Sequence, residues 1–272
     1  MRIAAVVIGG IVVIAAAGLL VLFLLQRRFI YPAPASRAPI TATGFVRVTL
    51  HTADGLALTA LYRPARARRT VIFFHGNGDS LAGALAATQA LAAAGYGVLL
   101  PEYRGYGGNQ GRPSEAGLYD DARAATAFLR QNGVPRDQTV AIGNSLGSGP
   151  ATQIATEEHL AGLIIVSGYT SLPAVAADAV RLPVAALIRD RYDNAAKLAA
   201  TNLPVLVLHG DNDRVIPVAH GRALAAAART RLAEFPGAGH GLAYWPQAGD
   251  AEVHWLDALP VDPVVAAADA VR

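Results

Sequence analysis

Short apolar runs alternate with alanine-rich, helix-like stretches over most of the chain. The apolar runs lie at 70–74, 97–100, 139–142, 163–166, 205–208 and 231–235. The helix-like stretches lie near 80–95, 114–132, 146–158 and 218–230, with a final one near 262–271. Continuous apolar runs of this length, separated by helices, are typical of parallel strands buried on both faces of a sheet. The pattern therefore predicts an α/β fold with helices on both faces of a mostly parallel sheet.

Two further strands are expected before this series, and one insertion within it. Residues 44–50 and 56–62 alternate between apolar and polar positions around Asp54-Gly55, a pair typical of hairpin turns, so these strands are predicted to be antiparallel. The interval 173–202 is longer than one crossover requires. We interpret it as a cap insertion of one or two short helices, broken at Pro183, although a helix packed on the sheet is an equal alternative.

The first thirty residues differ in composition from the rest. From Ile3 to Leu25 the chain has 23 residues without a charged side chain. As a helix this stretch is about 34 Å long, enough to cross the hydrocarbon core of a bilayer. A buried core helix is the alternative, but such helices are rarely apolar on every face. We therefore predict a transmembrane anchor at 1–30 that ends in an interfacial flank near Phe29 and Ile30, a spacer at 31–43 and the main domain at 44–272, with the membrane as a partner.

The residues that flank the apolar stretch indicate its processing and orientation. The small-x-small site Ala33-Pro34-Ala35 lies too far from the apolar core for a signal peptide, so the anchor is expected to remain uncleaved. Arg27, Arg28 and Arg37 beyond the stretch outnumber Arg2 before it. Because basic residues favour the cytoplasmic face, the main domain is expected on the cytoplasmic side.

Composition and charge exclude several function classes. The chain has 272 residues, 53% apolar, and no cysteine, which excludes disulfide frameworks, cysteine metal sites and thiolate nucleophiles. Its net charge of +3 arises in the first 43 residues, where four arginines and no acidic residue occur, so the remainder carries −1. That remainder has no basic excess to bind nucleic acid. Metal-ligand spacings such as H-E-x-x-H are missing from the sequence, so no cofactor is expected. Separately, the protein is expected to be monomeric.

A serine lies in the most specific local motif of the chain. Gly143-Asn144-Ser145-Leu146-Gly147 fits G-x-S-x-G, directly after an apolar run and before a helix-like stretch. A strand that turns sharply into a helix presents the hydroxyl at the edge of the sheet, and the flanking glycines leave room for the turn. The pentapeptide alone also fits an ordinary turn. In this context Ser145 is the candidate nucleophile.

A second motif follows the strand predicted at 70–74. His75-Gly76-Asn77-Gly78 ends this strand and opens a helix. Acyl transfer requires N–H donors aimed at the developing oxyanion, each worth about 3 kcal/mol of barrier. The backbone N–H groups of Asn77 and of Leu146, the residue after the serine, are predicted to form this oxyanion hole. His75 itself is expected to hold its loop rather than to act as a base.

Seven histidines compete for the role of general base that a serine nucleophile requires. His240 lies in the glycine-rich loop Gly237-Ala238-Gly239-His240-Gly241 after the last predicted strand, from which a side chain can reach back over the sheet edge. We therefore predict that His240 is the base. The others are expected to be structural: His51 and His209 in or at strands, His75 in its loop, His159 and His220 at helix ends, and His254 in an exposed tail segment.

The acid that orients the base is expected after a neighbouring strand. The segment His209 to Pro217 supplies two candidates, Asp211 and Asp213, and either gives the chain order serine, aspartate, histidine. Asp211 lies next to the strand end, where it is expected to tighten its own turn. Asp213 lies far enough out to reach His240 and is the predicted acid.

With these residues in place, the chain resembles the α/β-hydrolase superfamily over residues 44–272. It resembles most closely the membrane-anchored, bud-emergence-type (BEM-like) branch, which is similar to the protein depalmitoylases and to serine aminopeptidase-like hydrolases. The motifs that carry the resemblance are His75-Gly76-Asn77-Gly78, Tyr103-Arg104-Gly105-Tyr106-Gly107, Gly143-Asn144-Ser145-Leu146-Gly147, Tyr169-Thr170-Ser171-Leu172, Asp190-Arg191-Tyr192-Asp193, His209-Gly210-x-x-Asp213 and the anchor end Gln26-Arg27-Arg28-Phe29-Ile30-Tyr31. The resemblance implies an eight-stranded, mostly parallel sheet with its first two strands antiparallel. It fixes no substrate, because this fold supports many reactions.

The sequence therefore predicts a membrane-anchored serine hydrolase of the carboxylesterase or thioesterase type. Two alternatives stay open. A serine aminopeptidase needs a buried carboxylate for the substrate ammonium group, and the insertion offers Asp178, Asp190 and Asp193. A catalytically silent, membrane-anchored scaffold would keep the fold for binding alone, although no position of the predicted triad is substituted.

The insertion also bears on the substrate. Its apolar residues Leu182, Val184, Leu187 and Ile188 can cover an acyl pocket. A cap this short would leave the serine open, which suits esters or thioesters presented at a membrane surface.

Overall fold

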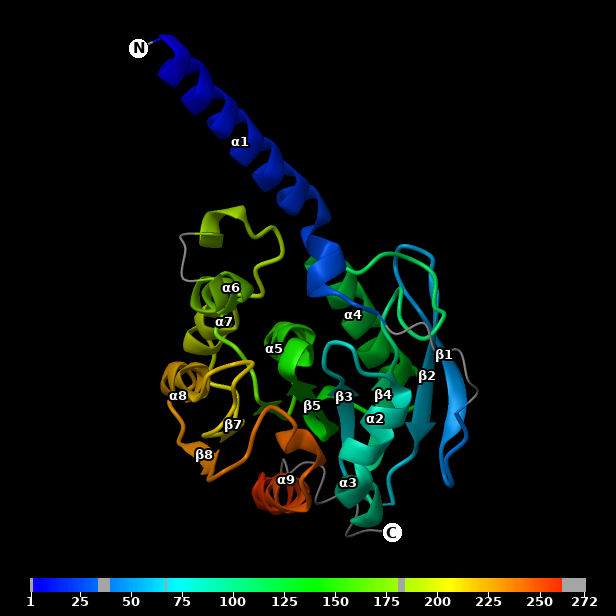
Figure 1. The fold of residues 1–272 in the computed structure, drawn as a ribbon. Coiled ribbons are helices and arrows are strands. Elements are labelled where there is room, and N and C mark those ends of the chain that lie inside the picture. The colour runs from blue at the N-terminus through cyan, green and yellow to red at the C-terminus, as the bar shows by residue number, and fades with distance from the viewer. Residues whose placement is uncertain (1, 34–39, 67, 181–183, 261–272) are drawn as a thin grey trace.

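The computed structural model describes residues 2–33, 40–66, 68–180 and 184–260 (Figure 1). Within helices, the side chains of residues 2–9, 11, 12, 15, 16, 180 and 184 are outside this description. Several predictions therefore lie outside the described residues: the helix at 262–271, the break at Pro183, the apolar side chains of Leu182 and Val184, and residues 34–39 of the spacer.

Eight strands form one mixed sheet, as the resemblance implied. The strands are β1 (Val46–His51), β2 (Ala57–Arg63), β3 (Thr70–Phe74), β4 (Gly97–Pro101), β5 (Thr139–Asn144), β6 (Gly162–Val166), β7 (Val205–Gly210) and β8 (Leu232–Phe235), in the order β1-β2-β4-β3-β5-β6-β7-β8. β2 pairs antiparallel with both β1 and β4, whereas the other neighbouring strands are parallel. The predicted strands agree with the observed ones to within two residues at each end.

Helices cover both faces of the sheet. They are α1 (Arg2–Ile30), α2 (Leu81–Ala87), α3 (Gln89–Ala93), α4 (Glu115–Gln131), α5 (Ser148–Glu157), α6 (Leu172–Val180), α7 (Asn194–Ala199), α8 (Val218–Ala227) and α9 (Pro246–Ala258). Residues of α4, α5, α7 and α8 belong to the apolar cluster on one face, and residues of α2, α3 and α9 to the cluster on the other. The helices predicted in the insertion are α6, the short 3-10 turn Val184–Leu187 and α7.

Strand β3 shows why the apolar runs predicted buried strands. All five of its residues are buried. Val71 and Phe73 pack into the cluster of α2, α3 and α9, while Ile72 and Phe74 pack into the cluster on the opposite face. Because successive side chains of a strand point to opposite faces, a strand covered on both sides requires apolar residues at every position.

The segment that carries His254 forms a helix that the sequence analysis did not predict. His254 was expected in an exposed tail segment, but residues 246–258 form α9, which begins with Pro246 in its first turn. His254 is exposed on it, as expected, but Leu256 and Glu252 are buried. A charged residue at a buried position interrupts the apolar period, which explains why the pattern did not reveal this helix.

Burial of Glu252 makes the stability of the fold sensitive to pH. Desolvation raises the pKa of Glu252 to about 8 from its ordinary value of 4.5, and Oε2 has no hydrogen-bond partner among the described residues. Between these two values the folded state holds a proton that the unfolded state has released. The free energy of unfolding therefore decreases, by up to a few kcal/mol, as the pH rises through this range.

Replacing Glu252 with glutamine is expected to remove this dependence. We expect Glu252→Gln to raise the melting temperature at pH 9 by about 5 °C and to change it little at pH 5. Thermal unfolding followed by circular dichroism measures the effect, with Asp250→Asn on the exposed side of the same helix as control. An equal change at both pH values would show that Glu252 does not titrate in this way.

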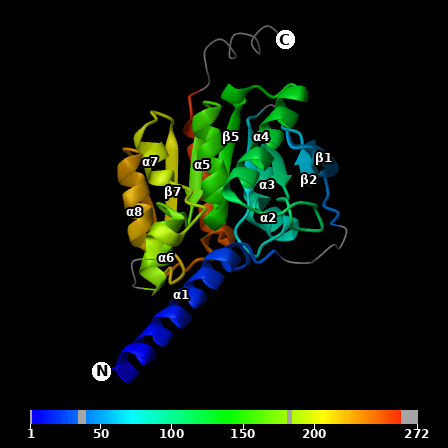
Figure 2. The same cartoon turned by 90° about the horizontal axis from the view of Figure 1, so that it is seen from above.

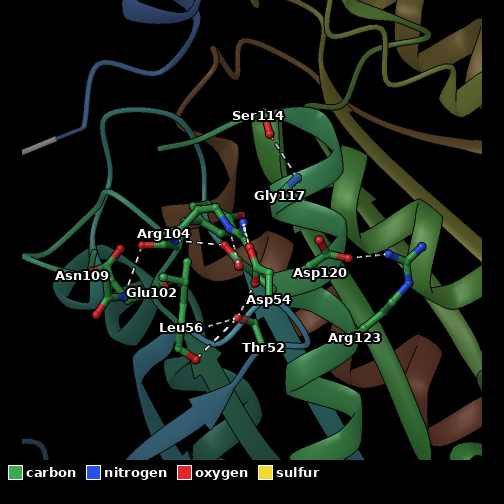
Figure 3. Close-up of polar contacts among 12 residues, drawn as sticks. Thr52, Asp54, Leu56, Glu102, Arg104, Asn109, Ser114, Gly117, Asp120 and Arg123 are labelled. Atoms are coloured by element: carbon green, nitrogen blue, oxygen red, sulfur yellow. Dashed lines mark hydrogen bonds and ion pairs between the residues drawn. The ribbon is translucent and has the colours of Figure 1, made fainter. Parts of the chain in front are cut away.

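A buried arginine joins the first hairpin to the helical layer. Arg104 follows β4, and its Nη1 donates to Oδ2 of Asp54, in the turn between β1 and β2, at 2.7 Å (Figure 3). Its Nε donates to Oδ1 of Asp121 on α4 at 2.8 Å. These contacts fix the loop that carries Tyr103 and Tyr106, which lie against the site described below.

The N-terminal segment forms a single helix that projects from the body (Figures 1 and 2). Leu19, Leu20 and Leu22 are more than half exposed, whereas Gln26 and Tyr31 at the end of the segment are buried. Among the residues that the structure describes, no helix has the length and hydrophobicity needed to cross a membrane. The transmembrane anchor predicted at residues 1–30 is therefore not supported by this structure.

Candidate active site

Ser145 lies in the sharp turn between β5 and α5, as the motif predicted. Its backbone is in the left-handed region with a φ of 50°, a conformation that costs energy for a residue with a side chain. A Cβ on Gly147 would lie 1.9 Å from the carbonyl oxygen of Phe74, and one on Gly143 would lie 2.5 Å from that of Gly147. Gly147 is therefore required by the packing of the turn against β3, and Gly143 by the close approach of the turn to its own backbone.

The structure brings Ser145, His240 and Asp213 together. The Oγ of Ser145 lies 2.9 Å from Nε2 of His240, and Nδ1 of His240 lies 2.8 Å from Oδ2 of Asp213. His240 reaches this position from the loop after β8, as the sequence analysis expected. The three side chains form one continuous hydrogen-bonded chain, which is the arrangement that activates a serine hydroxyl.

Asp213 is held in its charged form. Although burial disfavours the carboxylate, hydrogen bonds from His209, His240 and the backbone N–H of Ile216 lower the pKa of Asp213. Its Oδ1 accepts from the N–H groups of Val215 and Ile216, both at 2.9 Å. An ionised Asp213 can only accept, so Nδ1 of His240 carries the proton and Nε2 is left to accept from Ser145.

His209 is a contributor to this site that the sequence analysis assigned only to its strand. It is fully buried, and its Nε2 lies 2.9 Å from the carbonyl oxygen of Ile216 and 3.4 Å from Oδ2 of Asp213. The H-G-x-x-D spacing gave the signal, because a residue at the end of a strand and one four positions later can face each other across the following turn. His209 thus helps to position Asp213, the predicted acid.

Asp211 holds a different loop from the one expected. It was expected to tighten its own turn, but its Oδ1 accepts from the backbone N–H of Gly237 at 2.7 Å. Gly237 begins the loop that carries His240, and its φ of 75° favours glycine. Asp211 therefore supports the loop that carries His240, while Asp213 contacts the His240 side chain itself.

The two residues predicted to supply the oxyanion hole lie near Ser145. Asn77 and Leu146 both line the pocket that contains Ser145 and His240. In the loops and turns that the structure describes, neither backbone N–H donates to a protein acceptor. The side chain of Asn77 is fixed at both ends, because its Oδ1 accepts from Tyr106 Oη at 2.8 Å and its Nδ2 donates to the carbonyl oxygen of Ile30 at 2.7 Å.

His75 is buried beneath the Asn77 loop and contacts loop atoms rather than Ser145. Its Nδ1 donates to the carbonyl oxygen of Gly76 at 2.9 Å, and its Nε2 lies 2.9 Å from Oε1 of Glu102. Burial opposes the charged imidazolium, but the hydrogen bond and charge of Glu102 outweigh it and raise the pKa of His75. The ring of Tyr103 packs against the His75 ring at a tilt, with the two centroids 4.3 Å apart, and its hydroxyl donates to the His75 carbonyl oxygen. The strand-end position of Glu102 gave no sequence signal for this partnership.

The other histidines lie elsewhere. His51 ends β1, His159 follows α5 and His254 lies on α9. His220 on α8 is buried, with its Nδ1 2.9 Å from the hydroxyl of Thr170 and its Nε2 3.0 Å from Oδ2 of Asp178. Among the described residues, no group of three or more acidic or imidazole side chains is arranged to hold a metal ion.

An apolar pocket of about 390 Å³ opens onto Ser145, at the smaller end of the range of ligand pockets. Its described lining is apolar apart from the catalytic candidates, Asn77 and Tyr169. The lining residues are Ile30, Asn77, Ser145, Leu146, Tyr169, Leu172, Val175, Ala176, Ala179, Ile188, Val215, Ile216 and His240. α6 and Ile188 place part of the predicted insertion against this pocket, whereas Ile30 comes from the segment that was predicted to be a separate anchor.

The three acidic residues considered for an ammonium site are engaged outside this pocket. Asp178 pairs with His220, Asp190 pairs with Arg27, and Asp193 pairs with Arg191. The described part of the pocket lining contains no carboxylate. An apolar wall of this kind suits an acyl chain better than a charged amino group.

Comparisons with known proteins find related sequences and the same fold. The family model described as "Serine aminopeptidase, S33" matches residues 65–192. An uncharacterized protein of Mycobacterium tuberculosis is 36% identical over 227 residues, which cover 79% of this chain and 80% of that protein.

Solved structures extend the similarity to most of the chain. An alpha-beta hydrolase from Vibrio vulnificus has a TM-score of 0.71 at 22% identity, covering 85% of this chain and 92% of that one. An esterase of Pyrococcus furiosus has a TM-score of 0.66 at 17% identity, covering 82% and 95%. At these identities the similarity shows the fold. The narrower resemblance to a membrane-anchored bud-emergence branch is not supported by these comparisons.

Proposed function

Because the chain belongs to the serine aminopeptidase (S33) family of the α/β-hydrolase superfamily, we propose that it hydrolyses carboxylic esters or thioesters through an acyl-enzyme on Ser145. The observation that carries this proposal is the hydrogen-bonded chain from Ser145 through His240 to Asp213, at 2.9 and 2.8 Å, at the mouth of an apolar pocket. The esterase-like fold of the comparison structures is consistent with it.

The proposed reaction begins when Ser145 Oγ attacks the acyl carbonyl carbon. The hydroxyl proton moves to Nε2 of His240, and the ionised Asp213 stabilises the imidazolium that forms. The N–H groups of Asn77 and Leu146 stabilise the oxyanion. When the tetrahedral intermediate collapses, His240 returns the proton to the departing alcohol or thiol, which leaves the acyl group on Ser145. Water, deprotonated by His240, then releases the carboxylic acid and restores the serine.

An aminopeptidase activity is the second candidate, because the matching family model carries that description. The apolar lining of the pocket favours esters and thioesters, since a free substrate ammonium group would lack a charged partner there. A silent scaffold, the third alternative, is distinguished by the absence of any turnover.

The pH dependence of hydrolysis tests the proposed base. A neutral imidazole is required to accept the serine proton, so the rate should fall as the pH decreases, while the lowered pKa of Asp213 keeps the acid ionised. We expect His240→Ala to remove both this dependence and most of kcat/KM for p-nitrophenyl butyrate. His254→Ala, exposed on α9, is the control and should change neither. Wild-type kcat/KM in His240→Ala would exclude this residue as the base.

Membrane association through the N-terminal segment is a separate part of the proposal. It is supported by the uncharged stretch from Ile3 to Leu25 and by the exposed apolar side chains of α1. The arginines at 27, 28 and 37 favour the cytoplasmic side for the main domain. We expect the full chain to stay in the membrane fraction after an alkaline wash, which tests membrane insertion. We also expect protease to cleave the main domain in inverted vesicles, which tests its cytoplasmic orientation. A full chain found in the soluble fraction would contradict them.

A further inference from the structure

The last turn of α1 is joined to the 187–192 segment by paired polar contacts. Nε and Nη2 of Arg27 donate to the two carboxylate oxygens of Asp190, each at 2.8 Å. The side-chain amide of Gln26 donates to the carbonyl oxygen of Leu187 at 3.1 Å and accepts from the N–H of Arg189 at 2.8 Å. Two segments more than 160 residues apart in the sequence are therefore held in direct contact.

Asp190 is the centre of this connection. Its side chain is 3% exposed, and it also accepts from Tyr31 Oη at 3.1 Å and from the N–H of Glu115 at 3.2 Å. Burial, together with the charge of Asp190, raises the pKa of Tyr31, so its phenol stays protonated as a donor. Because a buried carboxylate is costly without its cation, removal of Arg27 should loosen the joined segments.

The same two segments line the pocket that contains Ser145. Ile30, in the last turn of α1, and Ile188, in the joined segment, both belong to its wall. The carbonyl oxygen of Ile30 also accepts from Nδ2 of Asn77 at 2.7 Å. The end of α1 thus contacts both the apolar pocket and the loop that carries the proposed oxyanion donor.

We propose that the last turn of α1 and the 187–192 segment form the wall of an acyl-binding subsite, in which Ile30 limits the acyl chain that the enzyme accepts. This proposal rests on the proposed hydrolase function and names its substrate class as straight, uncharged acyl chains of medium length. Arg27 acts as a positioning residue, because it holds the wall through Asp190 without touching the pocket. The small volume of the pocket and its apolar lining favour a chain that fills it and exclude longer ones.

A series of p-nitrophenyl esters from acetate to laurate tests the role of Ile30. For the full-length wild type we expect kcat/KM to rise by up to about fourfold per methylene until the pocket is filled, and then to fall. Ile30→Trp should move this maximum to shorter chains, and Ile30→Ala should move it to longer ones. The control is Phe29→Ala, since Phe29 is 69% exposed and should leave the maximum unchanged.

A second pair of variants tests the ion pair. Arg27→Gln should raise KM for the best medium-chain ester at least about fivefold while changing kcat less, because the wall binds the chain and does not take part in the chemistry. The control is Arg28→Gln, since Arg28 is exposed and no polar partner is found for it among the described residues. Rescue of KM by Arg27→Lys, which keeps the charge, would separate the role of the ion pair from that of the side-chain stem.

The outcomes separate this inference from the proposed function. If both Ile30 variants and Arg27→Gln keep the wild-type chain-length profile while hydrolysis still depends on Ser145, the acyl wall lies elsewhere and the inference is wrong. If hydrolysis does not depend on Ser145, the proposed function itself fails. Opposite shifts of the maximum in Ile30→Trp and Ile30→Ala support the inference, and they do not depend on either variant having full activity.

Discussion

Replacing Ser145 with alanine is expected to reduce ester hydrolysis by a factor on the order of 10⁴ to 10⁶, the range in which serine hydrolases lose rate without their nucleophile. The hydroxyl is the group that would form the acyl-enzyme, and its Oγ lies 2.9 Å from the proposed base. The variant should fold normally, because alanine also tolerates the backbone conformation of this turn at similar cost. It should also lose covalent labelling by a fluorophosphonate probe, which wild-type protein should show at a single site.

A matched serine substitution controls for general effects on the fold. Ser80 precedes α2 and makes no side-chain capping hydrogen bond, so Ser80→Ala should keep both turnover and labelling. Loss of activity in both variants would indicate an effect on folding, which circular dichroism would show. Normal turnover in purified Ser145→Ala would remove this residue from the mechanism and, with it, the proposed acyl-enzyme.

The strands and the turn of Ser145 were predictable because each depends on local sequence. Strand β3 is apolar at every position, since both faces of the sheet are covered. Gly143 and Gly147 stand where any side chain would collide with the backbone. These requirements act within a few residues, so the sequence displays them directly.

Contacts between distant segments could not be predicted in the same way. The sequence showed the uncharged stretch before Gln26 and led to the interpretation of residues 1–30 as a separate anchor. It could not show that Arg27 pairs with Asp190, because an ion pair depends on where the fold places both partners. Ile30 similarly looked like part of an interfacial flank, although the structure places it in the pocket wall.

The two aspartates after β7 show the same limit at shorter range. Chain order and distance along the sequence correctly indicated that Asp213 reaches His240. The prediction that Asp211 tightens its own turn was wrong. Its carboxylate accepts from the N–H of Gly237, in a loop that comes close to Asp211 only after β8 has paired with β7. His209 was interpreted only as a strand residue, although the H-G-x-x-D spacing indicates that it can face Asp213 once the intervening turn folds back.

These two aspartates provide the second large expected effect. Asp213→Asn is expected to lower kcat for ester hydrolysis by up to about 10⁴-fold, because an amide in place of the carboxylate can present an N–H to Nδ1 of His240. Nδ1 would then become the acceptor, and the proton would move to Nε2, where it blocks transfer from Ser145. The oxygen of the asparagine amide can still accept the hydrogen bonds that the N–H groups of Val215 and Ile216 donate to Oδ1 of Asp213. The loop after β7 should therefore stay folded.

Asp211→Asn is the matched comparison, since it changes the same chemical group two residues away. Its side-chain oxygen can still accept from the N–H of Gly237, so we expect a loss in kcat of less than about tenfold. Steady-state kinetics on p-nitrophenyl butyrate at pH 8, with thermal melting of both variants, measures the ranking. A larger loss of kcat in Asp211→Asn than in Asp213→Asn, at equal stability, would contradict this ranking. The contact of Asp211 with Gly237 would then matter more than the charge beside His240, and Asp213 would no longer be assigned as the acid.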